Sequence, residues 1–183
     1  TLDQSGVHGF SSVKAETFTG DGTTPAAGAI TIDEASAMTI AGLTTTSTVS
    51  LTTTGAITDT GDIAAGAITI NTTGGSNAAA RAVTIAGETT NATSWDVSTT
   101  NGAIAIDEDS AMAIAGISTS GTLSLTTTGA LTQSGAIGAG AVTVSASGQD
   151  VTLTHTSNAM TSVDITGKDI DVTDSDGIDI AAI

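Results

Sequence analysis

A long internal repeat dominates this sequence of 183 residues. The stretch from Gly28 to Ile70, GAITIDEASAMTIAGLTTTSTVSLTTTGAITDTGDIAAGAITI, returns as Gly102 to Val144, GAIAIDEDSAMAIAGISTSGTLSLTTTGALTQSGAIGAGAVTV. The copies align without a gap at an offset of 74 (102 − 28), and 28 of the 43 aligned positions are identical. Self-similarity at a fixed period is typical of repeat architectures, in which neighbouring units bury one another's apolar faces.

Pairs of apolar residues separated by one residue recur along both copies. They are Ile30/Ile32, Val49/Leu51, Ile68/Ile70, Val83/Ile85, Ile104/Ile106, Leu123/Leu125, Val142/Val144, Val163/Ile165 and Ile178/Ile180. The steps along the sequence are 19, 19, 15 and 21 in the first copy and 19, 19, 21 and 15 in the second, and each set adds up to 74. An apolar-x-apolar unit among Thr, Ser and Gly is typical of a short strand with alternate side chains facing inward. We therefore predict that each step is one coil of a β-solenoid.

The predicted fold is all-β: a right-handed parallel β-helix with about 19 residues per coil. Left-handed helices use a six-residue period, which steps of 15, 19 and 21 do not follow. We expect a single solenoid over 1–183, with the first repeat at 30–103, the second at 104–177 and the start of a third at 178–183. Residues 1–29, which contain both Phe and the only Pro, are either an irregular coil or a partial cap, with coil favoured.

Aromatic residues make up only 2% of the chain, against 39% hydrophobic residues in total. Wide globular cores are filled largely by aromatic side chains. A narrow core lined by aliphatic residues is therefore expected. Trp95, the only tryptophan, is in phase with core residues, and we interpret it as packing more than as a platform for a ligand.

The formal net charge of −16, with only three Lys and Arg residues, excludes a nucleic-acid-binding role, because such proteins need a basic footprint. The same charge repels an anionic membrane surface, and no apolar run is long enough to insert into a bilayer. There is no cysteine for a disulfide or a thiolate metal site. An acidic, Thr-rich surface favours an extracellular protein that stays soluble.

The acidic segment after Val163 is the one candidate metal site. Its calcium candidates are Asp171, Asp174, Asp176 and Asp179. An EF-hand loop with Gly177 at its sixth position would begin at Val172 and end at Ile183, so the motif fails at both ends. Weak calcium binding, or glycan recognition at 164–179, stays open beside the simpler interpretation of a turn with solvated carboxylates.

Other polar groups are interpreted as structural. Asp33-Glu34 and Asp107-Glu108-Asp109 occupy equivalent corners and are expected to be solvated there. His8 and His155 have no partner at metal-ligand spacing.

An enzyme is not expected, and no catalytic residue or cofactor is assigned. Asp169 and Asp171 share a strand face beside Lys168, as the carboxylates of a glycosidase or polysaccharide lyase would. The basic and aromatic residues that hold a sugar are nearly missing, however.

Runs of threonine raise a further alternative. They are Thr44 to Thr46, Thr52 to Thr54, Thr126 to Thr128, and Thr152-Leu-Thr-His-Thr156. An ice-binding face needs such residues on one side of every coil, whereas these runs fall at predicted turns. Threonine here is better explained by strand propensity and by the stacking of like residues between coils.

The phrases GALTQSGAIGAGAVTV at 129–144 and VTIAG at 83–87 resemble the repeats of filamentous haemagglutinin-type and autotransporter-like bacterial adhesins. The resemblance covers most of residues 28–183. It implies a right-handed parallel β-helix that is exported to the cell surface and used in attachment or in biofilm structure.

Together these features predict a structural, non-enzymatic segment of a large extracellular repeat protein, an adhesin stalk or surface fibre. The alternative is a subunit that stacks end to end into an extracellular filament. The expected partners are other copies of the chain or neighbouring repeats, and a host or surface receptor, either glycan or protein. Binding of calcium, glycan or ice by the solenoid is a lesser alternative.

Overall fold

The computed structural model describes residues 2–4, 10–74, 81–86 and 89–183. Within these residues the chain forms strands and no helix. The strands are β1 (Leu2–Gln4), β2 (Ser12–Glu16), β3 (Ile30–Glu34), β4 (Met38–Thr44), β5 (Val49–Thr53), β6 (Ile57–Asp59), β7 (Ile63–Asn71), β8 (Val83–Ile85), β9 (Thr90–Ser98), β10 (Ile104–Glu108), β11 (Met112–Ser118), β12 (Leu123–Thr127), β13 (Leu131–Gln133), β14 (Ile137–Ser145), β15 (Val151–Leu153), β16 (Ala159–Thr166), β17 (Ile170–Val172) and β18 (Asp179–Ala182).

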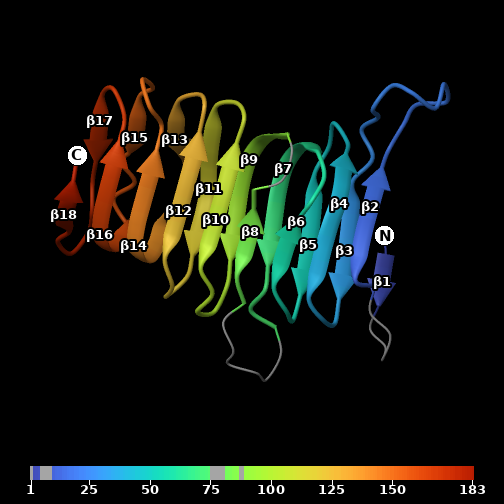
Figure 1. The fold of residues 1–183 in the computed structure, drawn as a ribbon, viewed down its shortest axis with the longest axis horizontal. Helices are drawn as coiled ribbons and strands as arrows, with labels where there is room; N and C mark the ends of the chain where they lie inside the picture. Colours follow the sequence, from blue (N-terminus) through green and yellow to red (C-terminus); the bar gives the residue numbers. More distant parts are fainter. Residues whose placement is uncertain (1, 5–9, 75–80, 87–88) are drawn as a thin grey trace.

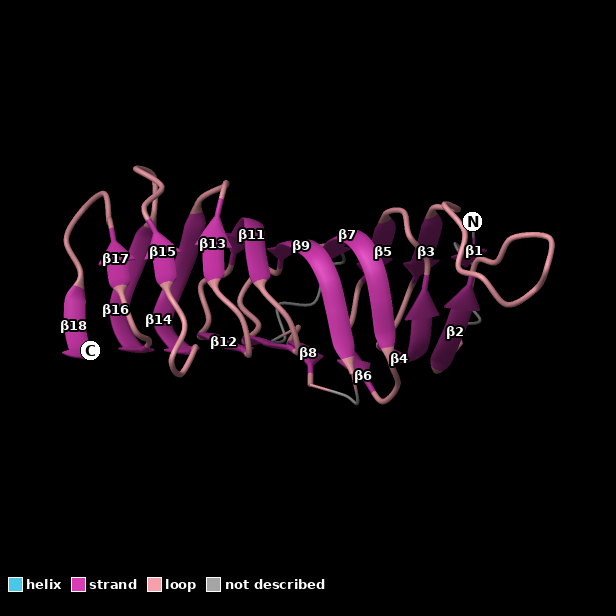
Figure 2. Cartoon of the chain, turned by 90° about the horizontal axis from the view of Figure 1, so that it is seen from above, coloured by secondary structure: helices cyan, strands magenta, loops and turns pink. Residues whose placement is uncertain are grey.

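The strands wind into the predicted β-solenoid, with about 7 turns and about 20 residues per turn. Strands of successive turns lie side by side from one end of the molecule to the other (Figure 1). The view from above shows them on opposite sides of a narrow interior (Figure 2). Each first-copy coil visits three parallel ladders: Ile30 pairs with Val49, Met38 with Ile57, and Leu43 with Ile63.

One side of the solenoid, face A, is a ladder that runs through the whole chain. It consists of β2, β4, β6, β8, β10, β12, β14, β16 and β18. Residues in matching register along this ladder are Met38, Ile57, Val83, Ile104, Leu123, Val142, Val163 and Ile180. A single column of aliphatic residues thus joins the two copies of the repeat.

A second side, face B, carries another column of residues in register. That column is Ile30, Val49, Ile68, Trp95 and Ile114, on β3, β5, β7, β9 and β11. The predicted neighbours Ile30 and Val49 are therefore confirmed to lie on adjacent coils.

One of the two shortest steps in the sequence, from Ile68 to Val83, is not a coil, and that part of the prediction is wrong. The partner of Ile68 on the next coil is Trp95 and not Val83. Val83 instead follows Ile57 on face A. The other short step, after Val163, does complete a coil, but its register is displaced by two residues because Val163 pairs with Ile180 and not with Ile178. The error arises because apolar pairs of faces A and B look alike in the sequence, so the step from Ile68 to Val83 passes from one column to the other.

The second copy is consequently turned by one side relative to the first. Ile104 is the repeat equivalent of Ile30, yet it lies on face A in the column of Met38. Met112, the equivalent of Met38, pairs in turn with Leu131 of β13, outside face A. One repeat therefore spans three coils and one further side.

The interior holds one aliphatic core, as the scarcity of aromatic residues predicted. Exchanges between the copies such as Leu43 with Ile117 and Val49 with Leu123 join residues that are buried in both places. Trp95 is fully buried in β9, as predicted from its phase. A packed interior accepts swaps between aliphatic residues of similar volume, which explains why these positions vary only in that way.

Buried threonines close the corners between strands. The hydroxyl of Thr127 donates to the carbonyl of Ser110 on the previous coil at 2.6 Å, and accepts from the N–H of Gly129 at 3.2 Å. Thr119 bonds in the same way to Gly102 and Gly121. Each hydroxyl thus links two backbone groups at a corner, where the regular ladder ends. Within the described residues no buried side-chain nitrogen or oxygen lacks a partner.

The connection between β2 and β3, residues 17–28, leaves the coil and projects from the side of the solenoid (Figures 1 and 2). We call it the tongue. It is a small hairpin with an antiparallel bridge between Phe18 and Pro25. At its tip the carboxylate of Asp21 accepts four hydrogen bonds from Thr19, Thr23 and Thr24. These bonds hold the pKa of Asp21 well below its usual range.

Candidate functional site

The four calcium candidates lie on the last coil. Asp171 is exposed in β17, and Asp179 is exposed in β18. The carboxylate of Asp174 turns back to accept from the backbone N–H of Met160 at 2.9 Å and from that of Asp176 at 3.2 Å. It thus already serves as a backbone acceptor between coils.

Asp174 and Asp176 influence each other's ionisation. Partial burial disfavours the ionised form of Asp174, but the N–H groups of Met160 and Asp176 outweigh it and lower the pKa of Asp174. A hydrogen bond to the Asp174 carboxylate, together with repulsion from its charge, raises the pKa of Asp176. These two carboxyl groups are therefore the pair that the structure brings together, whereas Asp171 and Asp179 lie apart on their strands.

Metal coordination needs several such groups around one point. Over residues 2–4, 10–74, 81–86 and 89–183 no group of three or more His, Cys, Asp or Glu side chains is placed to hold a metal ion. Calcium binding at this segment stays a prediction, which a titration of the protein with calcium would test.

The basic residue of the hypothetical glycosidase arrangement is engaged elsewhere. Lys168 forms ion pairs with Asp169 at 2.9 Å and with Asp150 at 3.2 Å. Hydrogen bonding to Asp169 and Asp150 raises the pKa of Lys168, and the bond to Lys168 lowers that of Asp169. Asp171 lies beyond this pair, beside Thr152 of β15. Lys168 thus belongs to an exposed salt-bridge cluster whose acidic partners are Asp150 and Asp169.

No functional role is assigned to either histidine. His155 accepts the N–H of Ser157 at its Nδ1 atom, at 3.2 Å, in a turn. His8 lies outside the described residues.

The corner carboxylates correct a second prediction. Glu34 and Glu108 are fully buried and not solvated. The neighbouring Asp33, Asp107 and Asp109 are exposed, as expected. Each corner thus directs one carboxylate inward and leaves its neighbours in solvent.

Glu108 binds two buried donors of the preceding coil and one hydroxyl of its own corner. It accepts the indole N–H of Trp95 at 2.9 Å, the backbone N–H of Ala92 at 3.2 Å and the hydroxyl of Ser110 at 2.9 Å. Burial raises the pKa of Glu108, although these hydrogen bonds oppose the rise.

Glu34 performs the same task in the first copy. Its carboxylate accepts from the backbone N–H of Phe10 at 2.9 Å, and from the N–H and hydroxyl of Ser36. A period-2 signal could have revealed both glutamates, since each follows its Ile-x-Ile pair by two positions and so points to the same inward side. Both carboxylates thus accept backbone N–H groups of the preceding coil at a corner, where the regular strand pairing ends, and their role is structural.

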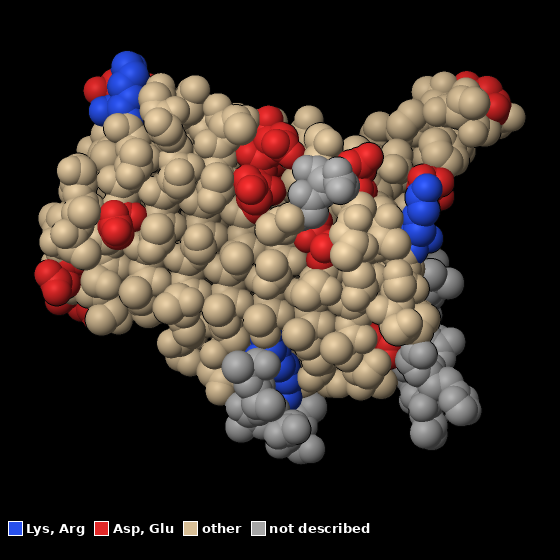
Figure 3. Space-filling view, in the orientation of Figure 1, with Lys and Arg blue, Asp and Glu red and all other residues tan. Residues whose placement is uncertain are grey.

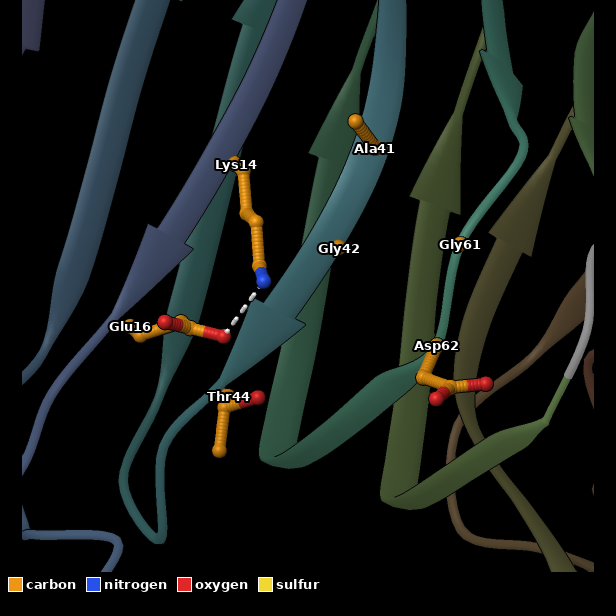
Figure 4. Close-up of a pocket in the computed structure, with 7 residues that line it drawn as sticks. All are labelled: Lys14, Glu16, Ala41, Gly42, Thr44, Gly61 and Asp62. Atoms are coloured by element: carbon orange, nitrogen blue, oxygen red, sulfur yellow. Dashed lines mark ion pairs between the residues drawn. The ribbon is translucent and has the colours of Figure 1, made fainter. Parts of the chain in front are cut away.

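A hollow of about 250 Å3 lies beside β2 and β4. Figure 4 shows Lys14 and Glu16 along one edge, Gly61 and Asp62 along the other, and Gly42 between them. The Lys14–Glu16 pair is 3.1 Å long, and the Lys14 side chain is 62% exposed. Coils approach closely here, because a Cβ atom at Gly61 would lie 2.1 Å from the carbonyl oxygen of Ala41. The closely packed glycines thus form the hollow, and an exposed ion pair lies at its rim.

The threonine runs do not form one outward face. Thr45, Thr53 and Thr127 are buried at corners, where their hydroxyls bond to backbone groups.

Acidic side chains are scattered over a largely uncharged surface in the view of Figure 3. The described residues include no helix long and apolar enough to cross a bilayer.

Comparison with known families adds one match. Residues 101–167 match the family described as Repeats of unknown function (DUF5649). The matched region begins beside the start of the second copy of the long repeat and extends through β16.

No curated protein matches the chain. No solved structure matches it either. The similarity to DUF5649 therefore supports a repeat protein, in agreement with the solenoid and the internal repeat, and it carries no activity with it.

Proposed function

We propose that this chain is a rigid structural segment of a large extracellular bacterial repeat protein, a stalk that holds other parts of that protein at a distance. The observation that carries the proposal is the unbroken ladder of face A, in which nine strands follow one another from β2 to β18. Eight spacings of about 4.8 Å give a length of about 38 Å. Such a ladder resists bending because every coil is hydrogen-bonded to the next.

The interior supports the same role. Aliphatic side chains stack on aliphatic side chains from Val13 to Ile165, and the corner groups of Thr and Glu satisfy the backbone where strands end. Stability in repeat proteins is the sum of such neighbour contacts, so that a stack can be lengthened by adding coils. The strong negative charge keeps such a surface soluble.

The stalk role can be tested by length. One, two and three tandem copies of the segment would be placed between two folded reporter domains and measured by small-angle X-ray scattering. A rigid stalk adds about 38 Å with each copy. An end-to-end distance that instead grows as the square root of copy number, as for a flexible linker, would refute it.

The extracellular location is proposed from the acidic, Thr-rich, cysteine-free composition and the resemblance to adhesin repeats. An antibody against the segment should label intact, unpermeabilised cells that express the native gene. Labelling that appears only after permeabilisation contradicts the location. An adhesin role further predicts that an in-frame deletion of the segment reduces attachment of those cells to a surface.

Self-assembly is the second candidate. The parallel ladders join each coil to the next through backbone pairing and columns of apolar residues in register, and the same pairing can join coils of two copies of the chain. Light scattering of the purified protein over a concentration series distinguishes the two roles: growing fibres support the filament, and a constant monomer mass rules it out.

A further inference from the structure

A groove of about 340 Å3 lies where the tongue meets the side of the solenoid. Its lining includes Pro25 from the tongue and Thr46, Ala64, Gly66, Asn91 and Thr93 from three successive coils. The volume lies within the range of about 300–1,000 Å3 that is usual for small-ligand sites. We propose that this groove binds a neutral saccharide, a function that goes beyond the stalk role.

The floor of the groove is low because the coils approach closely there. A Cβ atom at Gly66 would lie 2.5 Å from the carbonyl oxygen of Ser47, so that only glycine fits. Ala64 of β7 pairs with Thr44 on one side and with Asn91 on the other. Small side chains in the middle coil thus leave a hollow between larger polar ones.

The wall of the groove is held in place by hydrogen bonds at the base of the tongue. The carbonyl of Ala26, next to Pro25, accepts from the hydroxyls of Thr17 at 2.7 Å and Thr45 at 3.1 Å, and from the N–H of Thr46 at 3.2 Å. The Asp21 bonds fix the tip. A ligand therefore meets a preformed wall, which lowers the entropic cost of binding.

The polar groups around the hollow are uncommitted. Among the described residues, the hydroxyls of Thr44, Thr46 and Thr93 form no hydrogen bond within the chain, and Asn91 accepts a single long bond of 3.4 Å from Ser110. These hydroxyls and the amide can donate and accept, which is the pattern that sugar hydroxyls require. Pro25 and Ala64 offer apolar surface to the C–H face of a sugar ring.

Charge selects among saccharides. None of the described residues that line the groove is charged, so a cation finds no carboxylate among them. The net charge of −16 disfavours an anionic sugar. A neutral hexose or N-acetylhexosamine chain is the ligand class that fits both conditions.

The second copy of the repeat lacks this arrangement. Ser120, the equivalent of Thr46, donates its hydroxyl to the carbonyl of Thr100 at 3.1 Å. Thr99, at the equivalent position of Pro25, is buried at a corner and belongs to no tongue. The second copy therefore provides control positions within the same molecule.

The test is an amide NMR titration of the whole chain with maltohexaose, cellohexaose and chitohexaose, and with hexagalacturonate as an anionic comparison. We expect at least one neutral oligosaccharide to give saturable shifts at Ala64–Gly66, Asn91 and Thr93, with no such shifts from hexagalacturonate. Shifts by the anionic sugar alone, no shifts at all, or shifts centred elsewhere would each overturn the proposal.

Variants then locate the site. Thr46→Val with Thr93→Val removes two hydroxyls without changing shape and should weaken binding about tenfold, as the loss of two hydrogen bonds implies. Ala64→Tyr should abolish binding by filling the hollow. Ala141→Tyr, at an exposed position of β14 outside the groove, should leave binding unchanged. Equal loss in Ala64→Tyr and Ala141→Tyr contradicts the site, while the scattering test of the stalk stands independently.

Discussion

The carboxylate of Glu108 accepts the indole N–H of Trp95 at 2.9 Å in the interior of the solenoid, where both side chains are fully buried. The contact joins the only tryptophan to a corner of the next coil. This one carboxylate accepts hydrogen bonds from two buried donors, Trp95 Nε1 and Ala92 N, which would otherwise have no partner.

Replacing Glu108 by alanine should therefore destabilise the protein by about 3 kcal/mol or more, because buried donors are left unpaired. Urea unfolding followed by the fluorescence of Trp95 measures the loss. Asp107→Ala, at the exposed neighbouring position, is the control and should change stability by less than about 0.5 kcal/mol. A loss no greater than that of the control would show that the buried contact is dispensable.

The raised pKa of Glu108 gives stability a pH dependence of known sign. Burial is the main cause, and the charge of Asp109 adds to it. A carboxyl group whose pKa is higher in the folded than in the unfolded state contributes stability below the unfolded pKa, and loses it as pH rises through the folded pKa.

The free energy of unfolding of Glu108→Gln should therefore increase relative to that of the original protein as pH rises from about 4 toward neutrality, since a glutamate in an unfolded chain titrates at pH ~4.3. Parallel unfolding curves at a series of pH values provide the measurement. A difference between the two proteins that stays constant with pH, or that changes in the opposite direction, contradicts the shift.

Thr127→Val tests the corner hydroxyls. Valine keeps the shape but leaves the carbonyl of Ser110 and the N–H of Gly129 with only their 3.1 Å bond to each other, so a loss of about 1 kcal/mol is expected. Thr128→Val, at the exposed adjacent position, should be nearly neutral. Thermal unfolding of both variants decides the matter, and indistinguishable melting temperatures would remove the proposed role of the hydroxyl.

Gly135→Ala should prevent close coil packing, because its Cβ atom would lie 1.8 Å from the backbone oxygen of Ala115. A loss of more than about 4 kcal/mol, or failure to fold, is expected. Gly138→Ala is the matched control, since its Cβ atom would meet nothing closer than 3.9 Å. Circular dichroism with urea unfolding compares them, and equal stability of the two variants argues against the packing found here.

Engineered disulfides test the registry of the coils. Thr58 and Thr84 are direct partners on face A, at the strand spacing of about 4.8 Å that suits a disulfide. Thr58→Cys with Thr84→Cys should cross-link under mild oxidation, and the chain has no other cysteine to interfere. Thr69→Cys with Thr84→Cys, which stacking of Ile68 on Val83 would favour, should remain reduced. The reverse result on non-reducing gels would restore the short coil between Ile68 and Val83.

Much of the fold could be predicted from the sequence because strand periodicity and a repeat leave few alternatives. Pairs such as Ile30/Ile32 and Val49/Leu51 identify inward positions without knowledge of the winding. The side on which a pair lies is a different matter, since Ile68 and Val83 have equal local patterns and belong to different ladders. Only the long-range pairing of Ile68 with Trp95 separates them.

The candidate site was less predictable for a related reason. Glu34 and Glu108 are charged, and charge usually indicates exposure, yet their spacing from Ile32 and Ile106 placed them inside. The groove beside the tongue depends on how Pro25 returns to the coil of Thr46, which no local pattern encodes. Asp171 and Asp179 stood out by composition alone, and composition does not bring side chains together.

The one-side turn between copies has a consequence for any longer array built from this repeat. Each of the three ladders forms one side of the solenoid, so a turn by one side is a rotation of about a third of a circle. A receptor or antibody that recognises a feature of one copy therefore finds the same feature on the next copy rotated by that angle. Two arms approaching from one direction could not grip adjacent copies. Only the fourth copy would present its feature in the direction of the first, so that substitutions at one repeat position would trace a spiral around the fibre.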